Sequence, residues 1–232
     1  MQMYHPMMSN YNETMYYQYQ WLPQPVPPST LPLPLATPTR TLLLCTVPTH
    51  VSETTIRTDL QVFGEVKSVE MERLQEGIVT VHFYDLRHSA TALAAIQNRH
   101  IQQQYRMRLH YAALGSLNFP PPLPPLADGL VAGCAIWAQF YVPRTSAGSN
   151  QGILMVRYLD PVVSSSGVLE IFESYGAVKE LREAPLQRHR WFVEFFDIRD
   201  AAAAFLGLNG KRILRKHLKI SFITFPDGHG RM

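Results

Sequence analysis

Two stretches of the chain share one pattern of hydrophobic and polar positions. They are EGIVTVHFYDLRHSA, residues 76–90, and RHRWFVEFFDIRDA, residues 188–201. In each, apolar and polar residues alternate, and an aspartate then introduces an alanine-rich segment. Alternation with a period of two is typical of a half-buried strand, and an aspartate before periodic apolar positions is typical of a helix start. The pattern predicts the same strand-to-helix element twice.

The likeness between the two halves extends beyond these stretches at a fixed spacing. Adding 112 to the residue number maps Leu42 to Leu154, Ile56 to Val168, Leu60 to Phe172, Phe63 to Tyr175, Gly64 to Gly176, Val66 to Val178, Phe83 to Phe195 and Asp85 to Asp197. No gap is needed from the first predicted strand into the second predicted helix. A spacing kept over so many positions indicates a duplication.

Each half predicts the same order of elements. In the first half we expect strands at residues 41–48, 66–71, 77–84 and 106–111, a helix capped by Ser52 and a helix begun by Asp85. In the second half we expect strands in ILMVRYLDP and at residues 177–182, 190–196 and 217–222, with helices in GVLEIFESYG and AAAAFLGL. The predicted fold class is α+β, with two tandem ferredoxin-like βαββαβ domains at residues 41–112 and 152–225.

The segments around these domains have a different composition. Residues 1–40 are rich in Met, Tyr, Gln and Pro, which predicts a disordered tail, although its aromatic side chains could also contact a partner. Residues 113–151 form a predicted Pro-rich linker, whose PPPLPPL run could be a stiff spacer or a polyproline II ligand. The apolar residues 130–142 fit either a strand or a segment packed on a neighbouring domain, and residues 226–232 read as a tail.

Composition and charge limit the classes of function. Net charge is +3, and the second half carries the excess, with eleven Lys/Arg against eight Asp/Glu over residues 152–225, compared with seven of each over residues 41–112. Two cysteines and scattered histidines offer no disulfide framework, metal site or nucleophile with its base, so we expect no catalysis and no cofactor. No apolar run is long enough for a membrane span, which suggests a soluble intracellular protein.

The exposed face of a βαββαβ sheet is where the chemistry is expected. In RNA-recognition motifs both helices cover one face and bases stack on the other, on aromatic side chains of the first and third strands. At those positions the first half carries Leu43, Ile78 and Thr80, and Glu76 stands where a basic residue is usual. The first domain is therefore expected to be degenerate, keeping the buried half of the motif and losing the exposed half.

The second half carries more of the binding pattern. Trp191, Val193 and Phe195 alternate inward as predicted core, and Glu194 faces outward, where it would repel phosphate unless paired with an arginine. The candidate RNA-binding residues are Phe192, Arg190, Met155, Arg157, Arg188, His217 and Lys219. Phe192 can stack on a base, Arg190 can stack or bind phosphate, and the basic run KRILRKHLK extends the electrostatic surface along the sheet edge.

Several phrases together resemble one family. FVEFFDIRDAAAA with an upstream VHFYDLRHSATAL, the LVAGCAIWAQF segment and the Tyr/Pro-rich N-terminus are similar to the terminal-ear-like branch of plant Mei2-type RNA-binding proteins. The resemblance implies a nuclear regulator of development that binds RNA. It also implies a third, C-terminal recognition motif that these 232 residues do not include.

Two hypotheses follow. In the first, the second domain binds single-stranded RNA through its sheet face. In the second, the chain is a protein-interaction scaffold that uses the degenerate domain and the Pro-rich segments. A small-molecule regulatory domain on the same fold would require a glycine-rich ligand loop, which the sequence does not show.

Overall fold

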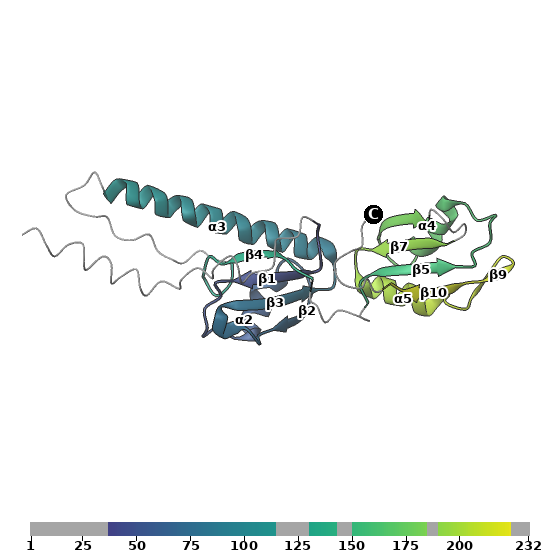
Figure 1. Ribbon diagram of the computed structural model, residues 1–232, viewed down its shortest axis with the longest axis horizontal. Coiled ribbons are helices and arrows are strands. Elements are labelled where there is room, and N and C mark those ends of the chain that lie inside the picture. Colours follow the sequence, from purple (N-terminus) through teal and green to yellow (C-terminus); the bar gives the residue numbers. More distant parts are fainter. Residues whose placement is uncertain (1–36, 115–129, 143–149, 185–189, 224–232) are drawn as a thin grey trace, which may run out of the picture.

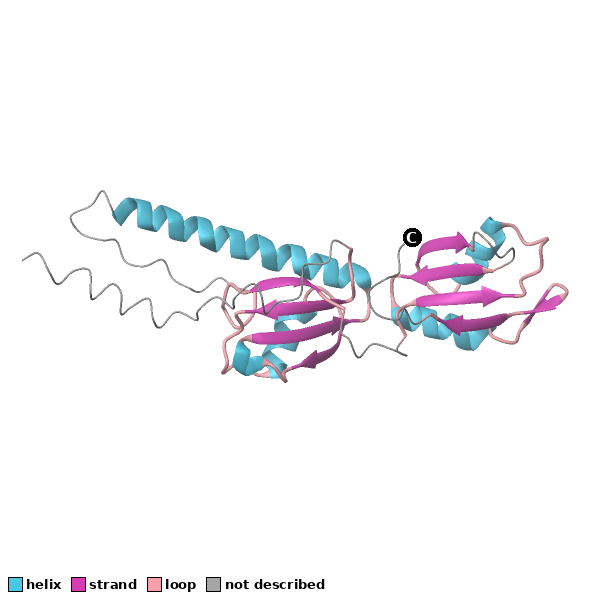
Figure 2. Cartoon of the chain, in the orientation of Figure 1, coloured by secondary structure: helices cyan, strands magenta, loops and turns pink. Residues whose placement is uncertain are grey.

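The structure is a computed structural model that describes residues 37–114, 130–142, 150–184 and 190–223. These residues form an α+β molecule with two four-stranded antiparallel sheets, joined end to end (Figure 1, Figure 2). We call the described residues up to 142 the first unit and those from 150 onward the second unit. The expected tail at residues 1–40 is described only from residue 37, and the proline-rich run of the linker lies outside the described residues.

The first unit follows the predicted order for three strands and two helices. Its elements are β1 (Thr41–Cys45), α2 (Glu53–Gln61), β2 (Val66–Glu70), the 3-10 turn η2 (Leu74–Glu76), β3 (Ile78–Phe83), α3 (Leu86–Leu114) and β4 (Trp137–Phe140). Ser52 caps α2 as expected, because its side chain accepts a hydrogen bond from the backbone N–H of Thr55. Leu42, Leu44 and Phe83 point from the sheet into the core beneath the helices.

The fourth strand of this sheet is not where the sequence predicted it. Residues 106–111, expected as a strand, lie inside α3, and β4 pairs with β1 instead, with Leu42 opposite Phe140 and Cys45 opposite Trp137. The physical reason is local: α3 contains no Gly or Pro, and Gln, Arg, Met and Leu are good helix formers. Part of the predicted linker therefore completes the first sheet in the order β2-β3-β1-β4.

The second unit has the same strand arrangement. Its elements are β5 (Ile153–Arg157), α4 (Ser165–Glu173), β6 (Val178–Glu183), β7 (Trp191–Phe195), α5 (Ile198–Leu208), the hairpin strands β8 (Arg212–Ile213) and β9 (Lys216–His217), and β10 (Lys219–Phe222). The sheet order is β10-β5-β7-β6. Phe172 and Phe195 meet edge to face in the core, with ring centroids 6.4 Å apart.

Two further features bear on function. The chain passes from β3 to α3 and from β7 to α5 at the junction of the two units, where these corners face each other (Figure 1). Among the described helices, none combines the length and the apolar character needed to cross a bilayer.

Candidate nucleic-acid interface

The outer face of the second sheet presents a row of side chains centred on Phe192. Antiparallel register places Phe192 of β7 beside Met155 of β5, which in turn lies beside Ser221 of β10. On the other side Phe192 lies beside Arg182 of β6. Phe192 and Met155 are half-buried, whereas Val193 of the same strand is fully buried on the opposite face. The predicted alternation of β7 is confirmed, with Trp191 only partly buried against the core.

A second row on this face is basic. Lys219 of β10 lies opposite Arg157 of β5, and continuing the register of β5 and β7 by one pair brings Arg190 beside Arg157. Arg190 is held in place by its backbone carbonyl, which accepts a hydrogen bond from the N–H of Ala184 at 2.8 Å. Three cationic side chains therefore stand in line next to the row of Phe192.

Arg157 has an unused hydrogen-bond donor. Its Nη2 reaches the hydroxyl of Ser221 at 3.4 Å, while its Nε is buried and has no hydrogen-bond partner within the described structure. A buried donor without a partner is uncommon in proteins and is costly unless a ligand or water satisfies it. An acceptor such as a phosphate or a base carbonyl that reached the guanidinium of Arg157 would offset this cost.

The negative charge of Glu194, which lies on the same face, is neutralised by an ion pair. Its carboxylate is paired with Lys179, at 2.7 Å, and both side chains are largely buried. The sequence analysis considered an arginine as the residue that could neutralise Glu194, and in the structure a lysine does so. The pair lies at the end of the sheet near the first unit, so the net positive charge is concentrated at the opposite end, where Lys219 and Arg190 lie.

One predicted site residue is placed differently, and another lies outside the described residues. His217 was expected on the fourth strand, but it belongs to the hairpin strand β9, and its Nδ1 contacts the carbonyl of Gly210 at 3.0 Å. The expected strand is interrupted at Leu218, which is buried, so the strand of the main sheet begins only at Lys219. Arg188 lies outside the described residues.

The outer face of the first sheet is closed by its own side chains. Leu43, Cys45 and Ile78 form a small apolar cluster on this face, each 2% exposed or less. Trp137 of β4 and Tyr141, just after it, pack against the cluster. Burial raises the pKa of the Cys45 thiol to about 11. No ring on this face occupies the place of Phe192, which in the first unit is Thr80.

Sequence reasoning missed Trp137 and Tyr141 as part of this face. Their segment was recognised as apolar enough for a strand, but its partner strand was not identified. The spacing by 112 could not reveal it, because the matching fourth strand of the second unit follows α5 directly through a short hairpin. The available signal was the short apolar run at residues 136–140, in which Ile136 and Ala138 are buried.

Comparison with known proteins agrees with this geometry. Residues 154–219 match the RNA recognition motif family. Together with the antiparallel sheet and the outward-facing Phe192, this match identifies the second unit as an RNA recognition motif, a fold that binds RNA on its sheet face.

The branch of the family is indicated by the relatives that the chain matches. The chain is 37% identical over 195 residues to the terminal ear1 homolog of Oryza sativa subsp. indica, covering 79% of this chain and 29% of the relative. It is 34% identical over 215 residues to terminal ear1 of Zea mays, covering 88% and 32%, and 29% identical over 186 residues to MEI2-like 2 of Oryza sativa subsp. japonica, covering 79% and 18%. These similarities, together with the matched RNA recognition motif, support a terminal-ear-like branch of the plant Mei2-type RNA-binding proteins for this chain.

The extent of these matches is limited. The chain spans about a third or less of the curated relatives it matches. Among solved structures, the C. elegans NONO-1 homodimer aligns with 87% of this chain and 70% of its own at 15% identity, with a TM-score of 0.36. That score is too low to compare how the two molecules are arranged.

Proposed function

We propose that this protein binds single-stranded RNA through the outer face of the second sheet. The observation that carries the proposal is the row of Phe192 and Met155 next to the basic row of Lys219, Arg157 and Arg190. A ring on a sheet face stacks on a base, and cations beside it hold the phosphates on either side. The face therefore offers both elements of single-strand recognition.

The charge distribution gives the bound strand a preferred region. The basic row lies at the end of the sheet far from the first unit, and the β8–β9 hairpin, which carries Arg212, Arg215 and Lys216, follows α5 there. At the other end Glu194 is neutralised by Lys179 and contributes no net attraction. We place the phosphate backbone over the distal half of the sheet and the hairpin.

The two units are proposed to be tandem RNA recognition motifs of unequal capacity. Both sheets have the same strand arrangement, but the first has an apolar, closed outer face. In keeping with the resemblance to the terminal-ear-like branch, we propose a nuclear regulator of development.

The test is RNA binding by the full chain, measured by fluorescence anisotropy with a labelled single-stranded oligonucleotide of mixed sequence. Phe192→Ala removes one stacking ring, worth about 1 to 3 kcal/mol, so affinity should fall by roughly 5- to 150-fold. Tyr105→Ala is the matched control, because Tyr105 is a ring that is 62% exposed on α3, away from the sheet. Equal affinity of the Phe192 variant and the wild type would refute the proposal.

A second candidate function is protein docking through α3. Ile101, Tyr105 and Leu109 are each more than half exposed, and their spacing of four places them on one face of the helix. The 29 residues of α3 include no Asp or Glu, so the apolar stripe lies on a basic helix. Such a helix fits an apolar groove with an acidic rim. Proximity labelling should lose a set of neighbouring proteins in Tyr105→Glu but retain it in Phe192→Ala.

A further inference from the structure

The junction between the two units is built from two matching segments. They are residues 84–87, Tyr-Asp-Leu-Arg, and residues 196–199, Phe-Asp-Ile-Arg, which are separated by 112 positions. The backbone N–H of Leu86 donates to the carbonyl of Phe196 at 3.0 Å, and the N–H of Ile198 donates to the carbonyl of Tyr84 at 3.1 Å. These two hydrogen bonds form an antiparallel bridge between Asp85 and Asp197.

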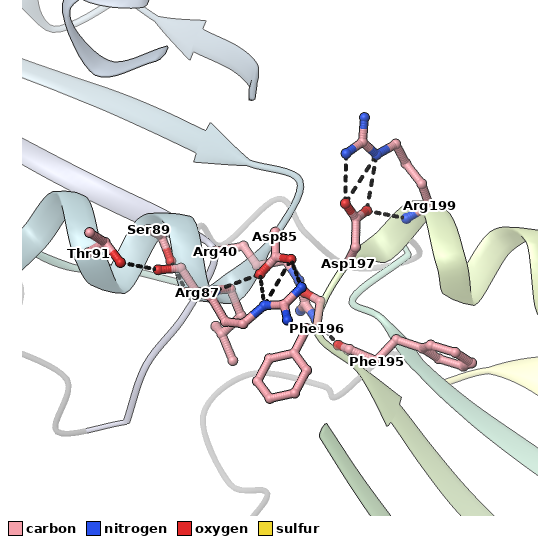
Figure 3. A network of polar contacts seen from close by, with 10 residues as sticks. Arg40, Asp85, Arg87, Ser89, Thr91, Phe195, Phe196, Asp197 and Arg199 are labelled. Carbon is pink, nitrogen blue, oxygen red and sulfur yellow. Dashed lines mark hydrogen bonds and ion pairs between the residues drawn. The ribbon is translucent and has the colours of Figure 1, made fainter. Parts of the chain in front are cut away.

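The side chains of the two segments also contact each other reciprocally. The guanidinium of Arg87 lies over the ring of Phe196, 4.6 Å from its centroid, and the guanidinium of Arg199 lies over Tyr84 at 4.4 Å. Each arginine is held by the aspartate of its own segment, at 2.6 Å for Arg87 and 2.7 Å for Arg199 (Figure 3). A cation over a ring is attractive, and the aspartate fixes its orientation.

Interchanging the two segments reproduces every one of these contacts. The backbone bonds, the two cation–ring pairs and the two Asp–Arg pairs all come in matched sets. Such reciprocity is the property of an isologous interface, in which the same surface is used on both partners and a two-fold axis passes between them. Here both partners belong to one chain.

Arg40 breaks this symmetry on one side. Its guanidinium donates to the carbonyls of Gln151, at 2.7 Å, and Phe196, at 3.0 Å, and also to that of Phe195. The residue 112 positions after Arg40 is Gly152, and a Cβ built there would lie 2.5 Å from Nη2 of Arg40. The first unit therefore supplies the arginine and the second supplies the space for it.

Glu65 adds a second one-sided contact. Its carboxylate pairs with Arg199 of the second unit. The residue at the matching position of the second unit is Ala177, which has no charge to offer to Arg87. Two copies of either unit would lack at least one of these contacts, so the additional binding energy favours pairing of the first unit with the second.

The symmetry also orients the two sheets. In Figure 1, β4 is the upper strand of the first sheet, whereas its counterpart β10 is the lower strand of the second, and the two units lie left and right of the junction. A half-turn about the line of sight exchanges left with right and top with bottom, but leaves front and back unchanged. The outer faces of the two sheets consequently point to the same side of the molecule.

We propose that residues 84–87 are an interaction surface whose partner is the matching segment at residues 196–199, and that Arg40 and Glu65 restrict the pairing to the first unit with the second. The chain then behaves as one body that presents the closed face and the Phe192 face side by side. The repeated Asp-Leu/Ile-Arg sequence serves this pairing in addition to starting a helix. Neither statement depends on whether the second sheet binds RNA.

The test compares two glycine substitutions in the full chain by residual dipolar couplings, without RNA. Gly152→Ala places a methyl group against Arg40, at a backbone φ of +78°, whereas Gly210→Ala has nothing within 4 Å at a φ of +80°. Both carry the same backbone strain, and only the first disturbs the junction. The wild type and Gly210→Ala should give one alignment tensor shared by both units, and Gly152→Ala should lose it.

Arg40→Ala provides a variant without backbone strain. The two units of this variant should also give two different alignment tensors. The amide spectra of both units should stay dispersed, which shows that each unit remains folded. A wild type with two different tensors, or an Arg40→Ala variant that keeps one shared tensor, would overturn the proposal. Because no RNA is present, failure of this test is distinct from failure of the RNA-binding proposal.

Discussion

At four matching positions the outer faces of the two sheets carry different side chains. Leu43, Cys45, Ile78 and Thr80 in the first unit correspond to Met155, Arg157, Arg190 and Phe192 in the second. The backbone register is shared, since Leu43 lies opposite Thr80 as Met155 lies opposite Phe192. The difference shows that one strand arrangement can be sealed or open, according to whether its outward residues are apolar and covered or charged and aromatic.

The cover itself differs as well. In the first unit Trp137 and Tyr141 pack over the outward cluster. In the second unit the corresponding edge strand β10 carries Lys219 and Ser221 outward, and neither can cover Phe192 with apolar surface. The edge strand therefore contributes, together with the central strands, to whether a ligand has access to the face.

The largest effect is expected on stability, from alanine at the matched pair Leu43 and Met155. Leu43 is 2% exposed, so Leu43→Ala should reduce the free energy of unfolding by about 2 to 5 kcal/mol. Met155 is half-buried on an open face, and Met155→Ala should cost on the order of 1 kcal/mol or less. Urea unfolding followed by amide signals of each unit measures both. Similar losses at the two positions would mean that the faces do not differ in burial.

Next in size is the salt dependence of RNA binding. Replacing Arg157 and Lys219 together by alanine removes two predicted phosphate contacts. The slope of log affinity against log salt should become shallower by roughly 1.4, since each contact to a single strand contributes about 0.7. The double variant of Arg99 and Arg108, both exposed on α3, is the control and should keep the wild-type slope. An unchanged slope in the double variant of Arg157 and Lys219 would show that the basic row does not contact the RNA phosphates.

A smaller change is expected from Glu194→Gln. Without the carboxylate, Lys179 loses its partner at 2.7 Å and adds positive charge near Phe192. RNA affinity should rise a few-fold at low salt and return toward the wild type at high salt, because screening weakens the added attraction. Glu173→Gln, at the exposed end of α4, should have no such effect. Weaker binding by the Glu194 variant would show that the pair supports the face in another way.

Because the outer face of the first sheet is closed, the thiol of Cys45 should not react with an alkylating reagent. Its thiol pKa is raised to about 11 by burial, so the reactive thiolate is scarce at pH 8 and becomes common only as the pH approaches 11. Mass spectrometry after brief iodoacetamide treatment at pH 8 should find Cys45 unmodified and Cys134, which is half-buried, modified. Rapid modification of Cys45 in the folded chain would show that the first face opens.

The sequence predicted the parts of the fold that depend on local periodicity. The alternation through Val193 and Phe195 identified β7 and its buried side, and Ser52 was recognised as a helix cap. Phe192, Met155, Arg157 and Lys219 were placed on one face because alternation alone determines the side of a sheet on which a residue lies.

What the sequence did not reveal depends on contacts distant along the chain. Residues 106–111 alternate like a strand, yet they continue α3 because nothing interrupts the helix before them. The strand that replaces them pairs with β1, more than ninety positions away, as Leu42 does with Phe140. Arg40 lies just before the first predicted strand without any local signal of its role, which appears only where the two units meet.

Titration of single-stranded RNA into the isotope-labelled full chain, followed by amide and methyl chemical shifts, tests the central claim most directly. We predict that the shifts concentrate on Met155, Arg157, Phe192 and Lys219, while Leu43 and Ile78 of the first unit remain unchanged. Shifts concentrated on β1 and β3, with the second sheet unaffected, would contradict the assignment of RNA binding to the open face.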